Sequence, residues 1–281
     1  MLACLARTPR GGSRRRGTAC RASGTRTLAL CAAALLAWVF LAGCPQRTIV
    51  RVPVSHENLI RANEVAREAD LAFARRDFYA ALIKYLEASR LNPNSQYITN
   101  KLGIAYSQLK YYTEAAMAFQ RSIALDRKFA FAYNNLGTVF FALDDKRSAE
   151  RNFKKAVSLQ DNVASFHINL GTLYFEKGKF EKGMEELRKG LELDPGVLGK
   201  GENVSLAASS SRNNSTERSY FMARVYASMG DVDRAVDSLQ QALNSGFTDI
   251  DAIRREPDFD KIRQETKFVA FMQQATLITK N

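Results

Sequence analysis

The four cysteines are the most reactive side chains of this chain, and all of them lie near its beginning. They are Cys4, Cys20, Cys31 and Cys44, and no thiol follows Cys44 in the 281-residue sequence. Thiolates serve proteins as nucleophiles, as disulfide partners and as ligands of zinc. The sequence beyond Cys44 therefore supports no cysteine chemistry of these three kinds.

Histidine is the next residue type to consider for catalysis, and the chain has only His56 and His167. His56 follows Ser55, which we expect to cap a first helix, and His167 lies at a packing position within a helix. Glu185 and Glu186 are adjacent on a helix and therefore point in different directions. No metal-ligand spacing, glycine-rich phosphate loop or serine-nucleophile motif occurs in the sequence. We therefore expect no enzymatic activity, no cofactor and no metal ion.

The formal net charge of +12 is concentrated in the first part of the chain. Residues 1–43 contain seven arginines and no acidic residue, and the rest of the chain holds 34 basic against 29 acidic side chains. A difference of +5 that is spread over amphipathic helices is typical of a solvated surface. Nucleic-acid binding needs a clustered basic face, so we expect no nucleic-acid partner.

Basic residues lead into an apolar stretch, LALCAAALLAWVFLAG, at residues 28–43. Its sixteen residues would extend about 24 Å as a helix, less than the roughly 30 Å of a hydrocarbon core. A basic segment followed by a short apolar one is typical of a secretory signal. The alternative is an uncleaved membrane anchor that happens to contain a cysteine.

The apolar stretch ends in Leu41-Ala42-Gly43-Cys44, which resembles the lipobox of bacterial lipoproteins. The resemblance implies that residues 1–43 are a signal peptide cleaved before Cys44, whose acyl chains then hold the protein on a membrane. Pro45 follows, where Asp would favour retention at the inner membrane, so we expect the outer membrane, facing the periplasm. Residues 44–57 contain two prolines and no helical period, and we expect them to form a tether.

The body of the chain repeats one pattern every 34 residues. The segments NKLGIAY, NNLGTVF and INLGTLY begin at residues 100, 134 and 168, and each is followed by a second apolar stretch. When every unit is numbered from its own first residue, positions 8, 20 and 27 always hold a small residue, as two helices in close contact require. Position 8, for example, is Ala69, Gly103, Gly137, Gly171 and Ala223.

This pattern resembles the tetratricopeptide repeat, which has Leu-Gly and Tyr in a first helix, and Ala, Phe and Ala in a second. The resemblance implies an all-α fold, a right-handed α-solenoid of about five helix-turn-helix units within residues 58–249. The units are expected at 62–95, 96–129, 130–163, 164–197 and 216–249, with a polar insertion at 198–215. Residues 250–281 resemble the capping helices of many such arrays, with apolar side chains that would cover the last unit: Ile250, Ile253, Phe259, Ile262, Phe268 and Phe271.

Positions 2, 5, 6 and 9 of the first helices form a stripe that stacking would carry to a concave groove. Asn135 and Asn169 share position 6, where an asparagine of related arrays holds the backbone of an extended peptide. Lys101 is the only basic side chain in the stripe, so we expect no clamp for a C-terminal carboxylate. Ordinary surface asparagines are the alternative. The predicted partner-binding groove comprises Tyr97, Asn100, Lys101, Phe131, Asn134, Asn135, Phe141, Ile168, Asn169 and Thr172.

These features together predict a membrane-anchored scaffold or adaptor that binds a protein or extended peptide in the bacterial cell envelope. One alternative is a resemblance to pilotin lipoproteins, which would imply an assembly factor for a type IV pilus or secretin complex. A second is a scaffold for peptidoglycan or polysaccharide machinery. The sequence identifies neither the partner nor the oligomeric state, because repeat arrays of one fold bind unrelated ligands.

Overall fold

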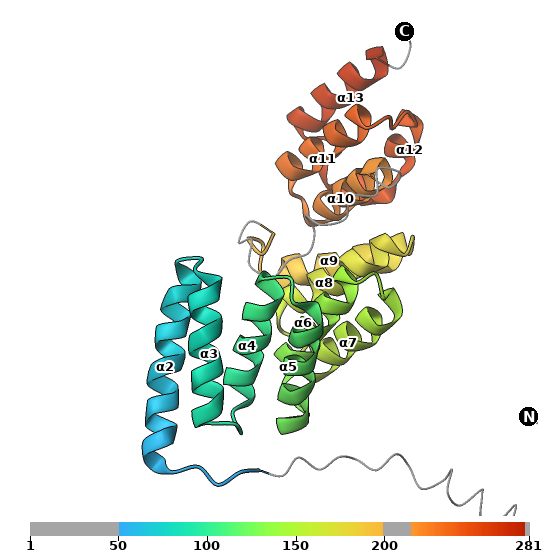
Figure 1. Ribbon diagram of the computed structural model, residues 1–281. Helices are drawn as coiled ribbons and strands as arrows, with labels where there is room; N and C mark the ends of the chain where they lie inside the picture. The colour runs from blue at the N-terminus through green and yellow to red at the C-terminus, as the bar shows by residue number, and fades with distance from the viewer. Residues whose placement is uncertain (1–50, 199–214, 279–281) are drawn as a thin grey trace, which may run out of the picture. The chain divides into compact units, whose positions relative to one another are not determined.

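The structure, a computed structural model, describes residues 51–198 and 215–278 (Figure 1). These residues belong to one compact unit, Ile49–Asn281. The expected signal peptide, Cys44, the first half of the expected tether and nearly all of the expected insertion lie outside the described residues. All regular elements in the described ranges are helices, which confirms the predicted all-α class.

The helices follow one another in pairs, one pair for each predicted unit, and Figure 1 shows α2 to α7 as successive antiparallel pairs. Within each pair the two helices pack together, and from α3 to α8 the second helix of one pair also contacts the first helix of the next. The pairs are α2 His56–Ala74 with α3 Phe78–Leu91, α4 Gln96–Gln108 with α5 Tyr112–Leu125, α6 Ala130–Ala142 with α7 Lys146–Leu159, α8 Ala164–Glu176 with α9 Phe180–Leu193, and α10 Ser215–Met229 with α11 Val232–Asn244.

Short polar side chains define where several helices begin. The Ser55 hydroxyl accepts a hydrogen bond from the Asn58 N–H at 3.2 Å, which is the capping role predicted for Ser55. Helix α2 therefore begins at His56, inside the segment expected to be a tether and before the expected first unit. Asp77 and Asp145 cap α3 and α7 in the same way.

Position 8 is small because the first helix meets a large ring of the second helix there. A Cβ atom on Gly103 would lie 2.6 Å from Phe119 Cε1, and one on Gly137 would lie 2.6 Å from Phe153 Cδ1. Both rings are almost completely buried. The contact between positions 8 and 24 therefore fixes how closely the two helices of a unit approach.

The C-terminal helices continue the same 34-residue register. They are α12 Ile250–Arg255, the 3₁₀ helix η3 Pro257–Ile262 and α13 Thr266–Ile278. Helix α13 lies 34 residues after α11 at both ends, so it occupies the place of a second helix. Pro257 falls at position 8, and because proline cannot continue the hydrogen-bonding of the helix, the first helix is interrupted after six residues. The predicted cap is thus a sixth unit with a shortened first helix.

The six apolar residues expected to form the cap are all buried, in one cluster with side chains of α10 and α11 such as Ala223, Val236 and Leu239. Burying a side chain of this size contributes about 1.5–3 kcal/mol. The cap therefore covers apolar surface of the fifth unit, as terminal repeats must.

Candidate functional site

The first helices of successive units lie next to one another, because α4 contacts α6 and α6 contacts α8. We use the term first-helix face for the side chains at positions 2, 5, 6 and 9 of the first four units. From α2 to α8 they are Asn63, Ala66, Arg67 and Asp70; Tyr97, Asn100, Lys101 and Ile104; Phe131, Asn134, Asn135 and Thr138; and Ser165, Ile168, Asn169 and Thr172.

The four predicted asparagines form the floor of this face and bond to one another. Asn135 Nδ2 donates to Asn100 Oδ1 at 3.1 Å, and Asn169 Nδ2 donates to Asn134 Oδ1 at 2.9 Å. A longer contact of 3.5 Å runs from Asn134 Nδ2 to Asn135 Oδ1. Position 6 of one unit thus pairs with position 5 of the unit before it, and the amides connect α4, α6 and α8. Sequence reasoning placed these residues on one surface and did not foresee their pairing.

Two buried polar atoms at the α8 end of the face lack a hydrogen-bond partner. They are Asn169 Oδ1 and Thr172 Oγ1, in side chains that are 2% and 3% exposed. A buried polar atom without a partner costs about 1–3 kcal/mol. A ligand that offers an N–H group at this point would remove that cost. Ile168, also predicted for the groove, is fully buried at this end and serves packing.

An aromatic row runs beside the asparagines. The rings of Tyr97 and Phe129 lie 4.9 Å apart edge to face, Phe129 and Phe131 lie 5.9 Å apart, and Phe131 and Phe166 lie 5.1 Å apart. Tyr97 is 63% exposed and Phe131 is 42% exposed, so the outer part of the row offers apolar surface to a partner. Phe129 was missed because it is the last residue of its unit and lies outside the predicted stripe.

Phe141 does not join this row, so its prediction as a groove anchor was wrong. It packs against the buried cluster of Ala149, Phe153 and Leu170. The reason is its register: Phe141 occupies position 12, whose equivalent in the next unit, Phe175, packs against the small residue at position 20, Gly183. The 34-residue spacing between Phe141 and Phe175 could therefore have predicted that Phe141 packs inside its unit.

A cavity of about 320 Å³ lies at the α2 end of the face, with Arg67, Asp70, Tyr97 and Lys101 in its lining. Lys101 Nζ lies 3.2 Å from Asp70 Oδ1, and the Tyr85 hydroxyl donates to the same carboxylate. Arg67 is exposed and shares position 6 with Lys101. The expectation that Lys101 is the only basic residue of the face was therefore wrong, because the stripe of the first unit was not included.

His167 lies away from this face and has a structural environment. Its Nδ1 is 2.7 Å from Glu186 Oε2, and its Nε2 is 2.7 Å from the Asp161 carbonyl oxygen. The hydrogen bond to Glu186 raises the pKa of His167, and burial opposes this increase. His167 therefore connects α8 to α9 and to the preceding loop, in agreement with its predicted packing role.

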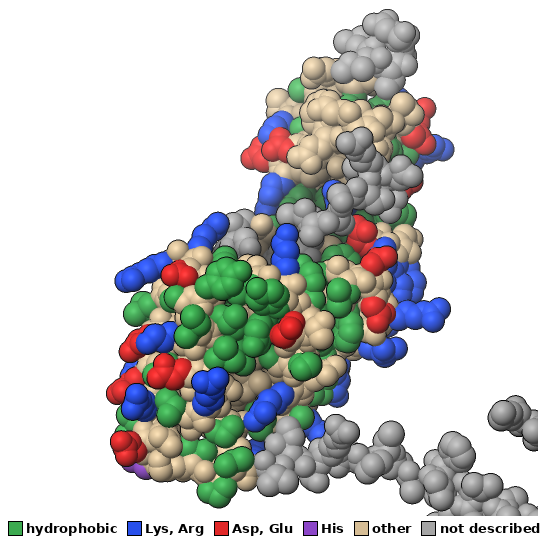
Figure 2. Space-filling model, viewed as in Figure 1, with side chains coloured by type: hydrophobic (Ala, Val, Ile, Leu, Met, Phe, Trp, Pro, Cys, Tyr) green, Lys and Arg blue, Asp and Glu red, His purple; other side chains and the backbone are tan. Residues whose placement is uncertain are grey.

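A second apolar surface lies on the second helices. Ile83 of α3 and Met117 of α5 both occupy position 22 and are more than half exposed, as is Tyr79. The same position holds Arg151 and Glu185 in the next two units, so this surface ends at α5. Figure 2 shows hydrophobic side chains gathered over the α3 to α6 part of the array.

Within residues 51–198 and 215–278, no cluster of three or more histidine, cysteine, aspartate or glutamate side chains is arranged to hold a metal ion. In the same part of the chain, no helix has both the length and the apolar character needed to cross a membrane.

Comparison with known proteins identifies the repeat. Family models described as tetratricopeptide repeat match residues 99–129, 132–163, 164–196 and 220–250, so the predicted repeat type is confirmed. A relative from Mycosarcoma maydis, small glutamine-rich tetratricopeptide repeat-containing protein 2, is 27% identical over 169 residues, which are 58% of this chain and 38% of that protein. The chain thus spans less than half of this relative's length.

Two solved structures that are similar to this chain have low sequence identity to it. The MamA protein is 22% identical with a TM-score of 0.46, over 72% of this chain and 97% of that one. A tetratricopeptide repeat protein of Thermus thermophilus, TTC0263, is 20% identical with a TM-score of 0.47, over 77% of this chain and 99% of that one.

Proposed function

Because residues 99–129, 132–163, 164–196 and 220–250 match models of the tetratricopeptide repeat, we propose that this chain is a membrane-anchored scaffold or adaptor of the bacterial cell envelope. It binds a protein partner through an extended peptide on the first-helix face. The observation that carries this proposal is the presence of two exposed rings, Tyr97 and Phe131, beside a floor of asparagine amides. An extended peptide matches both, because its side chains alternate with backbone donors and acceptors.

The asparagine chain leaves hydrogen-bonding capacity for a peptide backbone. Each amide has two N–H donors and an oxygen that can accept twice. Asn169 Oδ1 has no partner, so it can accept from a peptide N–H. Asn135, at 9% the most exposed of the four, can donate its second N–H to a peptide carbonyl. Such contacts do not depend on the side chains of the partner.

Arg67 and Lys101 favour an acidic group of the partner at the α2 end. Both basic side chains line the cavity there, and Asp70 is the one carboxylate among its lining residues. Exposed ion pairs contribute only about 0–1 kcal/mol each. Their effect is therefore on the orientation and association rate of the partner more than on its affinity.

The experiment compares residues 49–281 with the double variant Asn135→Ala, Asn169→Ala in capture from bacterial envelope extracts. We expect the variant to bind the captured partner at least about tenfold more weakly, because several backbone hydrogen bonds of about 1 kcal/mol each are lost. Asn152→Ala on α7 is the matched control and should bind normally. Circular dichroism must show equal helicity.

A second variant, Phe131→Ser, leaves the asparagine chain in place and separates binding from folding. It should also weaken capture, because it removes the exposed ring. The proposal is wrong if the double variant and Phe131→Ser both retain the partner at wild-type affinity.

Cys44 is the proposed attachment site, on the basis of the Leu-Ala-Gly-Cys segment that precedes Pro45. Cells fed a fatty-acid analogue should label the wild-type chain and leave Cys44→Ser unlabelled, because the cysteine supplies the acylated thiol. Cys31→Ser, which lies within the apolar stretch, is the control and should be labelled normally. Persistent labelling of Cys44→Ser would exclude this attachment.

The narrower form of the proposal is a pilotin-like assembly factor for a type IV pilus or secretin complex. It rests on the combination of a lipobox-like segment with a tetratricopeptide array. Capture of a secretin by residues 49–281 would support it, and capture of peptidoglycan or polysaccharide enzymes would support the broader scaffold role instead.

A further inference from the structure

The sixth unit leaves part of a helix-packing surface uncovered. In the complete units, positions 20, 24 and 27 of the second helix pack against the first helix, as Gly183 against Phe175 and Gly190 against Ile168 illustrate. In the sixth unit these positions are Val269, Gln273 and Thr276. Their first helix, α12, has six residues where α4, α6 and α8 have thirteen. Less helix is therefore available to cover α13.

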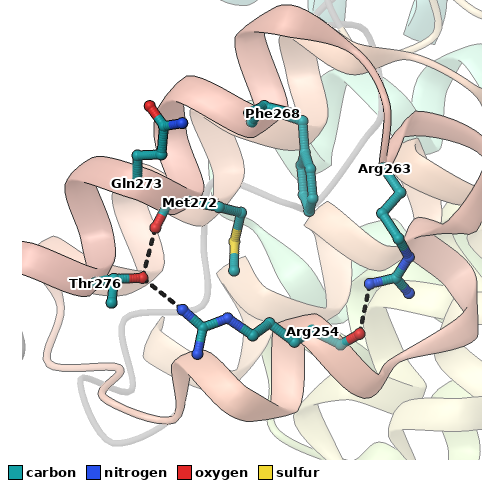
Figure 3. A pocket seen from close by; sticks show the side chains of 7 residues that line it. Arg254, Arg263, Phe268, Met272, Gln273 and Thr276 are labelled. Atoms are coloured by element: carbon teal, nitrogen blue, oxygen red, sulfur yellow. Dashed lines mark hydrogen bonds between the residues drawn. The ribbon is translucent and has the colours of Figure 1, made fainter.

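A pocket of about 540 Å³ occupies the uncovered region (Figure 3). Its lining includes Val269, Met272, Gln273 and Thr276, which recur at the i, i+3, i+4, i+7 spacing of one helix face. Phe268 contributes to its floor and is 3% exposed. Figure 3 shows Phe268 and Met272 extending from α13 toward α12, the helix that carries Arg254. The pocket thus lies between one face of α13 and the two arginines Arg254 and Arg263.

The charged residues of the lining are two arginines, Arg254 and Arg263, without a carboxylate among them. Arg263 is fully engaged, because its guanidinium donates to Asp260 and to the carbonyl oxygens of Arg254 and Glu256. Arg254 donates to Thr276 Oγ1 and to Asp251, each at 2.7 Å. The side chains of Arg254 and Asp251 are both exposed. Another carboxylate can therefore replace Asp251 at little cost in free energy.

We propose that this pocket binds a short amphipathic helix of a partner protein, with apolar side chains against Val269 and Met272 and a carboxylate on Arg254. The register favours a helix, because the uncovered positions are those that contact a helix in every complete unit. The charge favours an acidic one, because both charged residues of the lining are arginines and Arg254 can exchange its exposed partner Asp251 for a carboxylate of the helix. This site lies on α12, α13 and the segment between them and shares no residue with the first-helix face, so it is independent of the proposed function.

The probe is a fluorescein-labelled peptide based on α10, STERSYFMARVYASM, which is the first helix of a complete unit. In the peptide Arg218→Gln and Arg224→Gln are introduced, so that Glu217 is its only charged side chain. On this helix Glu217, Phe221 and Val225 fall on one face at i, i+4, i+8. We expect residues 49–281 to bind it with a Kd of about 10–100 μM, because a single short helix makes few contacts and the peptide must also become ordered on binding. Fluorescence anisotropy measures the affinity.

Three changes test the predicted contacts. Met272→Glu and Val269→Glu should each weaken binding at least about tenfold, since they place a charge in the apolar groove. Arg254→Gln should weaken it about threefold to tenfold and reduce its dependence on salt. A peptide with Glu217→Gln should bind the wild-type protein more weakly by the same threefold to tenfold factor. The same peptide change should not alter binding to the Arg254→Gln protein. Met117→Glu on α5 is the matched control and should bind normally.

Circular dichroism and thermal unfolding confirm that each variant is folded, and Val269→Glu, at a side chain 38% exposed, is the variant least expected to disturb the core. The proposal is overturned if the probe shows no saturable binding up to about 1 mM, which corresponds to about −4 kcal/mol. It is also overturned if both glutamate variants bind like the wild type. Self-association of the chain that Met272→Glu abolishes would identify a second copy as the occupant and contradict a partner helix.

Discussion

Replacement of Gly137 by leucine is expected to lower the free energy of unfolding by about 3 kcal/mol, the upper part of the range for overpacked cores. The added Cβ would lie 2.6 Å from Cδ1 of Phe153, a ring that is 1% exposed. The ring packs with Ala149, Leu170 and Leu173, so it cannot move aside without disturbing that cluster. Urea unfolding followed by circular dichroism measures the change.

A double-mutant cycle shows that the loss comes from this contact. Phe153→Ala alone should cost about 3–5 kcal/mol through the cavity that it leaves. When both changes are combined, the leucine side chain fills part of that cavity, so the total cost should be well below the sum of the two. Ala142→Leu, at an exposed position of the same helix, is the control and should be close to neutral. Strict additivity would contradict the assigned contact.

Replacement of His167 by glutamine is expected to lower the free energy of unfolding by about 1.5–3 kcal/mol at pH 5.5, the value of hydrogen bonds to charged groups. Both ring nitrogens face acceptors, Glu186 Oε2 and the Asp161 carbonyl oxygen. Only the doubly protonated ring can donate to both, so the folded state favours the charged form.

The pH dependence has a defined sign. The pKa of His167 is raised in the folded chain, chiefly by the hydrogen bond to Glu186, above an unfolded value near 6.5. Its contribution is therefore complete below about pH 6.5 and is lost as the pH rises through the folded pKa. The difference in the free energy of unfolding between wild type and His167→Gln, measured by urea unfolding, should shrink between pH 5.5 and pH 9. A difference that is constant, or that grows with pH, would contradict this assignment.

The repeat and most of its boundaries could be predicted from the sequence, because close helix contacts demand small residues at fixed positions. Gly137 and its equivalents show this directly, since their missing Cβ atoms are required by the rings at position 24. Pro257 lies in the same register, and its position could have predicted the interrupted helix of the sixth unit. The early start of α2 depends on one capping hydroxyl, that of Ser55, which the repeat pattern does not contain.

The candidate site was predictable as a surface but not as a set of contacts. Helical spacing placed Asn100, Asn134, Asn135 and Asn169 on one face. Whether each amide points to solvent or to a neighbour depends on the lateral offset of successive units, which pairs position 6 with position 5 of the unit before it. Phe141 was misassigned for a related reason, because its contact at position 20 is a property of the folded pair.

Site-specific photo-crosslinking is the most direct test of whether the first-helix face binds a peptide of a protein partner. Benzoylphenylalanine is placed at Phe131, which is 42% exposed on the first-helix face, or at Met117, which is 59% exposed on a second helix. We expect benzoylphenylalanine at position 131 to crosslink one defined partner peptide in envelope preparations, and the added changes Asn135→Ala and Asn169→Ala to remove the crosslink. The Met117 position should give no crosslink to that peptide. Equal crosslinking from both positions, or from Met117 alone, would contradict peptide binding on the first-helix face.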